Sequence, residues 1–172
     1  MKNPVSAFRS GYPNSLKTFS VLLLMAYVAY AAATDIADLT RKAEAGDANA
    51  QLQLADAYEK GIGVKQDDKL AFQWRRKAAD QGNAEAQNAV GVMYSLGRGV
   101  EQSKEEALRW YKKAARQHLA KADYNVAISY YNGDGMEADL VRAYTWMMLT
   151  KRNGDPDADQ ALSRMRDRKS VV

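Results

Sequence analysis

Apolar residues recur at helical spacing in three consecutive stretches of this chain. The spacing of three to four residues is that of one buried helix face. The three sets are Ala50, Leu54, Ala57 and Tyr58; Ala86, Val90, Met93 and Tyr94; and Ala122, Val126 and Tyr130. Small residues lie on the following turn at Ala55, Gly91 and Ala127, which leaves room for close approach of a neighbouring helix. Each stretch therefore predicts a helix that packs against another.

A second helix is predicted after each of these. A Gly-x-Gly turn ends the first helix, and a residue suited to an N-cap follows at Asp67, Ser103 and Asp139. Alanine and tryptophan then recur at helical spacing, with one tryptophan in each stretch at Trp74, Trp110 and Trp146. We expect these three tryptophans to be buried core residues.

The predicted helix pair occurs three times with a period of 36 residues, as the spacing of Tyr58, Tyr94 and Tyr130 shows. Residues 46–81 and 82–117 share 15 identities in 36 positions, and residues 118–153 keep the same skeleton. A period of this length is typical of a solenoid, in which each unit buries its apolar face only against its neighbours. The sequence thus predicts an all-α solenoid of three repeats.

Capping helices are expected at both ends. Residues 34–45 occupy the register of a second helix without its tryptophan. Residues 154–172 begin a fourth first helix, with Asp155 as N-cap and Pro156 at the first helical position. Arg166 stands in this helix where the repeated tyrosine belongs. A terminal helix must turn a polar face to water, so both segments are predicted to be caps.

These motifs resemble the Sel1-like repeat, a relative of the tetratricopeptide repeat. The resemblance is carried by Ala50 to Val64 with Ala71 to Gly82, and again by Ala86 to Val100 with Ala107 to Ala115. It implies a right-handed α/α solenoid whose first helices line a concave groove. It also implies a non-enzymatic protein–protein interaction module, acting as adaptor, regulator or effector-neutralising protein. A remote alternative, binding or hydrolysis of β-lactams or peptidoglycan fragments, comes from cysteine-stapled relatives, whereas this chain has no cysteine.

Residues 1–33 have the layout of a secretory signal. Lys2, Arg9 and Lys17 precede an uncharged stretch, Thr18 to Thr34, which ends in small residues. We expect cleavage and a periplasmic or secreted protein; retention as an anchor is the alternative. Without those three bases, 22 basic residues face 21 acidic ones, so the charge gives no reason to expect nucleic acid as a partner. No stable membrane insertion is expected after cleavage.

No catalytic, cofactor or metal site is predicted. The Gly-x-Gly turns lack the lysine and hydroxyl residue of a nucleotide-binding loop. Asn132 to Gly135 lacks the ligand spacing of a calcium loop. His118 is the only histidine, and the sequence suggests no partner for general-base chemistry.

Partner contacts are predicted where the repeats vary while their skeleton holds. The candidate positions on the first helices are Asp56, Glu59, Asn88, Val92, Ser95, Tyr124, Ile128 and Tyr131. We interpret them as a groove that grades from acidic to aromatic and binds a protein or peptide; several are equally consistent with half-buried packing residues. Self-association, such as a homodimer, is a further alternative, because Met147, Met148 and Leu149 make the second helix of the third repeat unusually apolar. That surface is available for a dimer if the C-terminal cap does not cover it.

Overall fold

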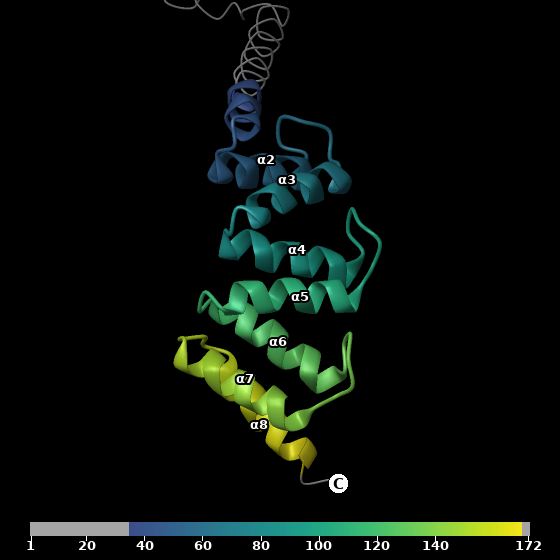
Figure 1. Ribbon diagram of the computed structural model, residues 1–172, viewed down its shortest axis with the longest axis vertical. Coiled ribbons are helices and arrows are strands. Elements are labelled where there is room, and N and C mark those ends of the chain that lie inside the picture. Colours follow the sequence, from purple (N-terminus) through teal and green to yellow (C-terminus); the bar gives the residue numbers. More distant parts are fainter. Residues whose placement is uncertain (1–34, 170–172) are drawn as a thin grey trace, which may run out of the picture.

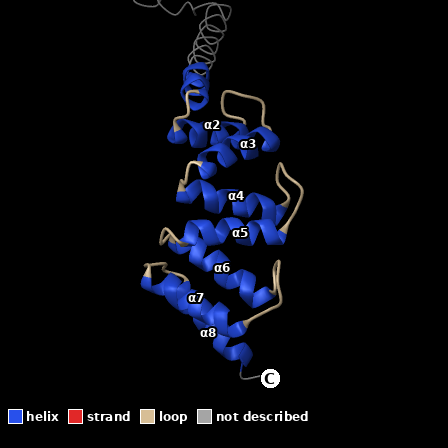
Figure 2. Ribbon diagram, in the orientation of Figure 1, coloured by secondary structure: helices blue, strands red, loops and turns tan. Residues whose placement is uncertain are grey.

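The computed structural model describes residues 35–169, which form an all-helical stack. Figure 1 shows the helices following one another along the long axis, and Figure 2 shows only helices and loops in the described part. Each helix packs against the helix before and after it in the chain. A helix over residues 35–44 precedes the labelled ones, which are α2 (Ala48–Lys60), α3 (Asp68–Asp80), α4 (Ala84–Leu96), α5 (Lys104–Ala115), α6 (Ala120–Asn132), α7 (Leu140–Arg152) and α8 (Ala158–Lys169).

The helix ends are held by capping residues. Asp47 and Asn83 cap α2 and α4, each accepting a hydrogen bond of 2.9 Å from a backbone N–H of the first turn. The second helices begin after the predicted caps Asp67, Ser103 and Asp139. Each first helix ends on a glycine with positive φ, namely Gly61, Gly97 and Gly133.

The third repeat departs from this scheme at its start. α6 follows Leu119, which offers no side-chain cap. Its preceding turn places His118 at φ 61°, the left-handed conformation that Gly82 and Gly154 adopt in the other inter-repeat turns. Because left-handed backbone favours glycine, this turn is less well matched to its residue than the others.

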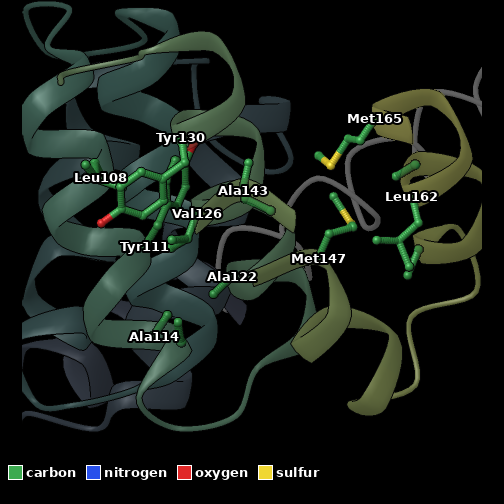
Figure 3. Close-up of a cluster of buried hydrophobic side chains, with 14 of the residues drawn as sticks. Leu108, Tyr111, Ala114, Ala122, Val126, Tyr130, Ala143, Met147, Leu162 and Met165 are labelled. Carbon is green, nitrogen blue, oxygen red and sulfur yellow. The ribbon is translucent and has the colours of Figure 1, made fainter. Parts of the chain in front are cut away.

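The largest buried cluster lies in the C-terminal half. It joins α5, α6, α7 and α8, and Figure 3 shows Met147 of α7 beside Leu162 and Met165 of α8. Two smaller clusters follow toward the N-terminus: one centres on Val90 and Trp110, the other on Ala43, Ala50 and Leu54. The core therefore follows the stack as three clusters and is thinner at its beginning.

Where the two helices of the second repeat cross, a small residue of the first helix faces a large residue of the second. A Cβ atom built on Gly91 of α4 would lie 2.6 Å from the Tyr111 ring of α5. The register equivalents of this pair are Ala55 with Arg75 in the first repeat and Ala127 with Met147 in the third. The predicted close approach is thus present in the second repeat.

Successive repeats also meet through their Gly-x-Gly turns. A Cβ atom on Gly99 would lie 1.9 Å from the Asp68 carbonyl oxygen, and one on Gly135 would lie 2.7 Å from the Glu105 nitrogen. The residue between the two glycines forms an ion pair at the same junction: Arg98 with Asp68 at 3.3 Å, and Asp134 with Lys104 at 3.9 Å. The sign of the pair is reversed from one junction to the next.

A buried amide ladder provides a second link between repeats. Gln51 donates to the Ala43 carbonyl at 3.0 Å and Gln87 to the Ala79 carbonyl at 3.1 Å. The equivalent position in the third repeat is Asp123, which is 2% exposed and accepts a bond of 2.6 Å from Asn153. Burial raises the pKa of the Asp123 carboxyl, although the bond from Asn153 acts in the opposite direction.

Two expectations need correction. Only Trp110 is fully buried; Trp74 and Trp146 are half-buried, because each lies in a terminal repeat with fewer covering neighbours. The fourth first helix begins at Ala158 rather than at Pro156, since the Asp155 side chain caps a turn by accepting from the Asp157 N–H. Arg166 is exposed on α8, as expected of a cap.

Candidate functional site

The acidic end of the predicted groove is neutralised. Arg75 of α3 reaches across to α2, where it pairs with Asp56 at 2.6 Å and with Glu59. Arg98 of the next repeat also contacts Glu59, at 2.9 Å. The hydrogen bond from Arg75 lowers the pKa of the Glu59 carboxyl despite partial burial. This corner therefore consists of matched charges and presents no free acidic patch.

A polar hollow lies beside Asn88 and Tyr124, two of the predicted partner-binding positions. The Asn125 amide of α6 donates to the Asn88 side-chain oxygen of α4 at 2.8 Å. Around this pair lies a hollow of about 260 Å³, lined by Asn88, Lys121, Tyr124, Asn125, Asp155 and Asp157. The lining comes from two successive first helices and from the turn before a third, so the hollow follows the repeat direction.

Ser95 lies at the far end of α4 and belongs to a different environment. Its hydroxyl oxygen accepts from the Lys104 amine at 3.0 Å, and its carbonyl accepts from the Gln102 amide at 2.8 Å. Burial raises the pKa of the neighbouring Tyr111 hydroxyl, against the effect of its hydrogen bond with Ser95. Ser95 therefore holds the turn between α4 and α5 in place.

The remaining candidates are half-buried packing residues. Val92, Ile128 and Tyr131 rest against the largest core cluster. Tyr131 also lines a separate cleft of about 320 Å³ between α7 and α8, together with Leu140, Val141, Tyr144, Thr145, Met165 and Arg166. The structure thus brings Asn88 and Tyr124 together and distributes the other candidates over three further places.

Asn125 and Lys121 line the hollow but were absent from the predicted set. Asn125 lies 37 residues after Asn88, one position outside the repeat period, so a comparison of register equivalents passes over it. The spacing of about 3.6 residues per turn gives the signal that would have found it, because Lys121 and Asn125 share a helix face.

No three His, Asp or Glu side chains of the described residues form a group that could hold a metal ion. His118 is exposed in its turn. The hollow offers amides, one amine and two carboxylates, which suits recognition of polar groups. None of the helices within residues 35–169 is long and apolar enough to cross a membrane.

Comparison with known proteins agrees with this architecture. The family model of the Sel1 repeat matches residues 48–83, 84–119 and 120–162. A Sel1 repeat protein from Oxalobacter formigenes is similar, with 35% identity and a TM-score of 0.68 over 76% of this chain and 98% of that one. A search of curated proteins gave no match.

Two further solved structures are similar. A protective antigen of uropathogenic Escherichia coli displaying an SLR fold has 36% identity and a TM-score of 0.71; the match covers 73% of this chain but only 27% of that protein's length. Cysteine rich protein B of Helicobacter pylori shares the fold at 21% identity and a TM-score of 0.57, over 73% of this chain and 95% of its own. Three matched repeats and the stacked helix pairs place this chain in the Sel1 repeat family.

Proposed function

We propose that this chain is a non-enzymatic protein–protein interaction module of the cell envelope that binds an extended segment of a partner along its first helices. Sel1 repeats generally mediate protein interactions. In a helical-pair solenoid one series of helices forms a continuous surface that suits a long, narrow ligand. The adaptor, regulator and effector-neutralising roles all use this same surface.

The hollow around Asn88 and Asn125 is the observation that carries the proposal. The bond joins one N–H of Asn125 to the side-chain oxygen of Asn88, so it does not use the Asn125 oxygen or the Asn88 N–H groups, and both residues line the hollow. An amide that both donates and accepts matches the pattern of a peptide backbone. Tyr124 adds an aromatic surface beside them, and aromatic residues are frequent anchors at protein interfaces.

The other predicted positions contribute to the proposed surface in different ways. Val92, Ile128 and Tyr131 support the surface by packing, and their exposed edges extend it toward the third repeat. Asp56 and Glu59 form a rim with Arg75, so we expect them to affect the association rate and its salt dependence more than the affinity.

Export is part of the same proposal. The signal layout of residues 1–33 lies outside the described residues. Mass spectrometry of the exported protein should give a new N-terminus between Ala32 and Thr34. Recovery of the intact chain in the membrane fraction alone would contradict this assignment.

The groove is tested by a pull-down with the exported protein as bait, followed by titration of the captured partner. Asn88→Ala and Asn125→Ala should each weaken binding about tenfold, as the loss of a hydrogen-bonding group at an interface centre does. Asn132→Ala is the matched control, because Asn132 lies on the same helix as Asn125 but is exposed outside the hollow. Unchanged binding by both hollow variants would contradict the groove assignment.

A further inference from the structure

One face of α7 is apolar although no described residue covers it. Ala143, Met147 and Thr150 form the buried side of this helix. On the opposite side Val141 is 73% exposed, Met148 46% and Tyr144 39%. At 100° per residue, Val141, Thr145 and Met148 fall on one stripe facing away from the core. We call the residues Val141, Tyr144, Thr145, Met148 and Arg152 the α7 outer stripe.

The same positions are mostly polar in the other two second helices. The register equivalents of the stripe are Lys69, Phe72, Gln73, Arg76 and Asp80 in α3, and Glu105, Leu108, Arg109 and Lys112 in α5 with Arg116 at its C-cap. Val141 and Met148 thus replace four charged residues. The repeat architecture does not require apolar residues at these two positions, so they have a reason specific to α7.

The cap does not supply that reason. α8 packs against the buried side of α7. There, Met147 of α7 lies in the same core cluster as Leu162 and Met165 of α8. Hollows remain on both flanks of the stripe. One is the cleft of about 320 Å³ that includes Val141, Tyr144 and Met165; the other is lined by Thr145, Met148, Leu149, Lys151 and Arg152. The stripe is thus a ridge between two grooves.

α7 and the residues just before it are complementary to their own reverse at two pairs of positions. About a midpoint between Tyr144 and Thr145, Val141 is matched with Met148, and both lie on the stripe. Glu137 before the helix is matched with Arg152 at its end, and both are exposed. An antiparallel pair of α7 helices would therefore put apolar residues at its centre and opposite charges at both ends. A parallel pair would put like charges together.

We propose that the α7 outer stripe binds a second copy of this chain, with the two α7 helices antiparallel about a twofold axis between Tyr144 and Thr145. Met148 of each copy then enters the cleft beside Val141 of the other. A twofold interface uses the same patch on both subunits, as this arrangement requires. It lies on the second helices and leaves the hollow around Asn88 open, so it adds a function to the proposed groove and does not depend on it.

The contact is small, and this sets the conditions of the test. α7 has 13 residues, which is about 20 Å at 1.5 Å per residue. Sedimentation velocity of the purified protein across micromolar to millimolar concentrations should show a reversible monomer–dimer equilibrium. Val141→Glu and Met148→Glu should each raise the dissociation constant at least tenfold. Glu105→Lys, at the register equivalent of Val141 in α5, is the control and should not change it.

Cross-linking tests the position of the axis. The chain contains no cysteine, so a single introduced cysteine reports one site. Thr145→Cys should form a disulfide-linked dimer under mild oxidation, because the two copies of residue 145 lie beside the axis. Arg109→Cys, its register equivalent in α5 and also exposed, should remain monomeric under the same conditions.

A charge exchange distinguishes this interface from loss of folding. Glu137→Arg and Arg152→Glu should each weaken the dimer, whereas an equimolar mixture of the two variants should associate like the wild type. In that mixture every end of the interface again joins opposite charges. A protein that stays monomeric at all concentrations, an absence of the Thr145→Cys cross-link, or a mixture no better than either variant would overturn the proposal.

Discussion

At the scale of single residues, the three repeats use different pairs of residues at the same two register positions of their helices. The narrow side of the helix crossing holds glycine or alanine, and the broad side holds tyrosine, arginine or methionine. Gly91 faces Tyr111, which is buried, while the third repeat uses Ala127 with the fully buried Met147. The choice on one helix therefore constrains the choice on the other.

Gly91→Ala should destabilise the protein although alanine favours helix. The new Cβ would lie 2.6 Å from the Tyr111 ring, and overpacking of this kind costs about 1–3 kcal/mol. Chemical denaturation measures the effect. Combining it with Tyr111→Met copies the pair of the third repeat and should recover most of the loss. Additive destabilisation in the double variant would argue against the pairing.

Asp123→Gln should stabilise the protein in a pH-dependent way. Glutamine at the same position in the other repeats donates to a backbone carbonyl, which a carboxylate cannot do. Burial raises the pKa of Asp123, so the folded chain holds this proton more tightly than the unfolded chain. The group's contribution to stability is therefore full below the unfolded pKa of about 3.9 and is lost as the pH rises through the folded value.

Thermal melts over a pH series test this. We expect a gain of about 1 kcal/mol for Asp123→Gln at neutral pH. The gain should shrink as the pH falls through the raised folded pKa toward about 4, because the wild-type carboxyl becomes protonated there, and should be smallest below that pH. Glu101→Gln, in an exposed turn, is the control. A gain that is the same at every pH would mean that the buried charge is not its cause.

At the scale of helices, the sequence predicted what depends on local residues. The caps Asp67, Ser103 and Asp139 and the glycines that end the first helices act within one turn, so their pattern located the helices. Burial of the tryptophans depends on neighbours instead. Trp110 has a repeat on both sides, whereas Trp74 and Trp146 are each covered less.

Trp110→Ala should therefore cost more than the same change at the register equivalents. Trp110 is 3% exposed in its cluster, and truncating a buried tryptophan costs about 3–5 kcal/mol. Trp74→Ala should cost clearly less, because part of that ring already faces solvent beside Lys77. Denaturant midpoints of the two variants provide the comparison. Equal losses would show that position in the stack does not govern the contribution.

The candidate site was predictable only in part, for a related reason. Register comparison identified Asn88 and Tyr124, since both vary where the skeleton is constant. It could not show that Arg75 would reach Asp56, because that contact joins different helices and depends on side-chain length. The pairing of Asn88 with Asn125 likewise depends on how successive first helices are offset.

At the scale of the whole molecule, the uneven core predicts uneven local stability. The largest cluster joins α5 to α8, whereas the N-terminal cluster is built on only three fully buried residues. In a solenoid each repeat is stabilised only by its neighbours, so the thinner end opens more often. Hydrogen exchange should show the strongest amide protection in α5, α6 and α7 and the weakest over residues 35–44 and α2. Uniform protection would indicate a single cooperative unit.

The reversed ion pairs at the two junctions bear on how a repetitive chain avoids folding errors. Units that share one fold and one skeleton of residues can dock out of order, for example the third onto the first with the second looped out. That mistake would bring Asp134 against Asp68, two like charges, in place of the native pairs Asp134 with Lys104 and Arg98 with Asp68. Because the signs are reversed from one junction to the next, each repeat is matched electrostatically to its own neighbour. The ion pairs therefore disfavour misfolded states in which one repeat is skipped, which the shared glycines and alanines alone would permit.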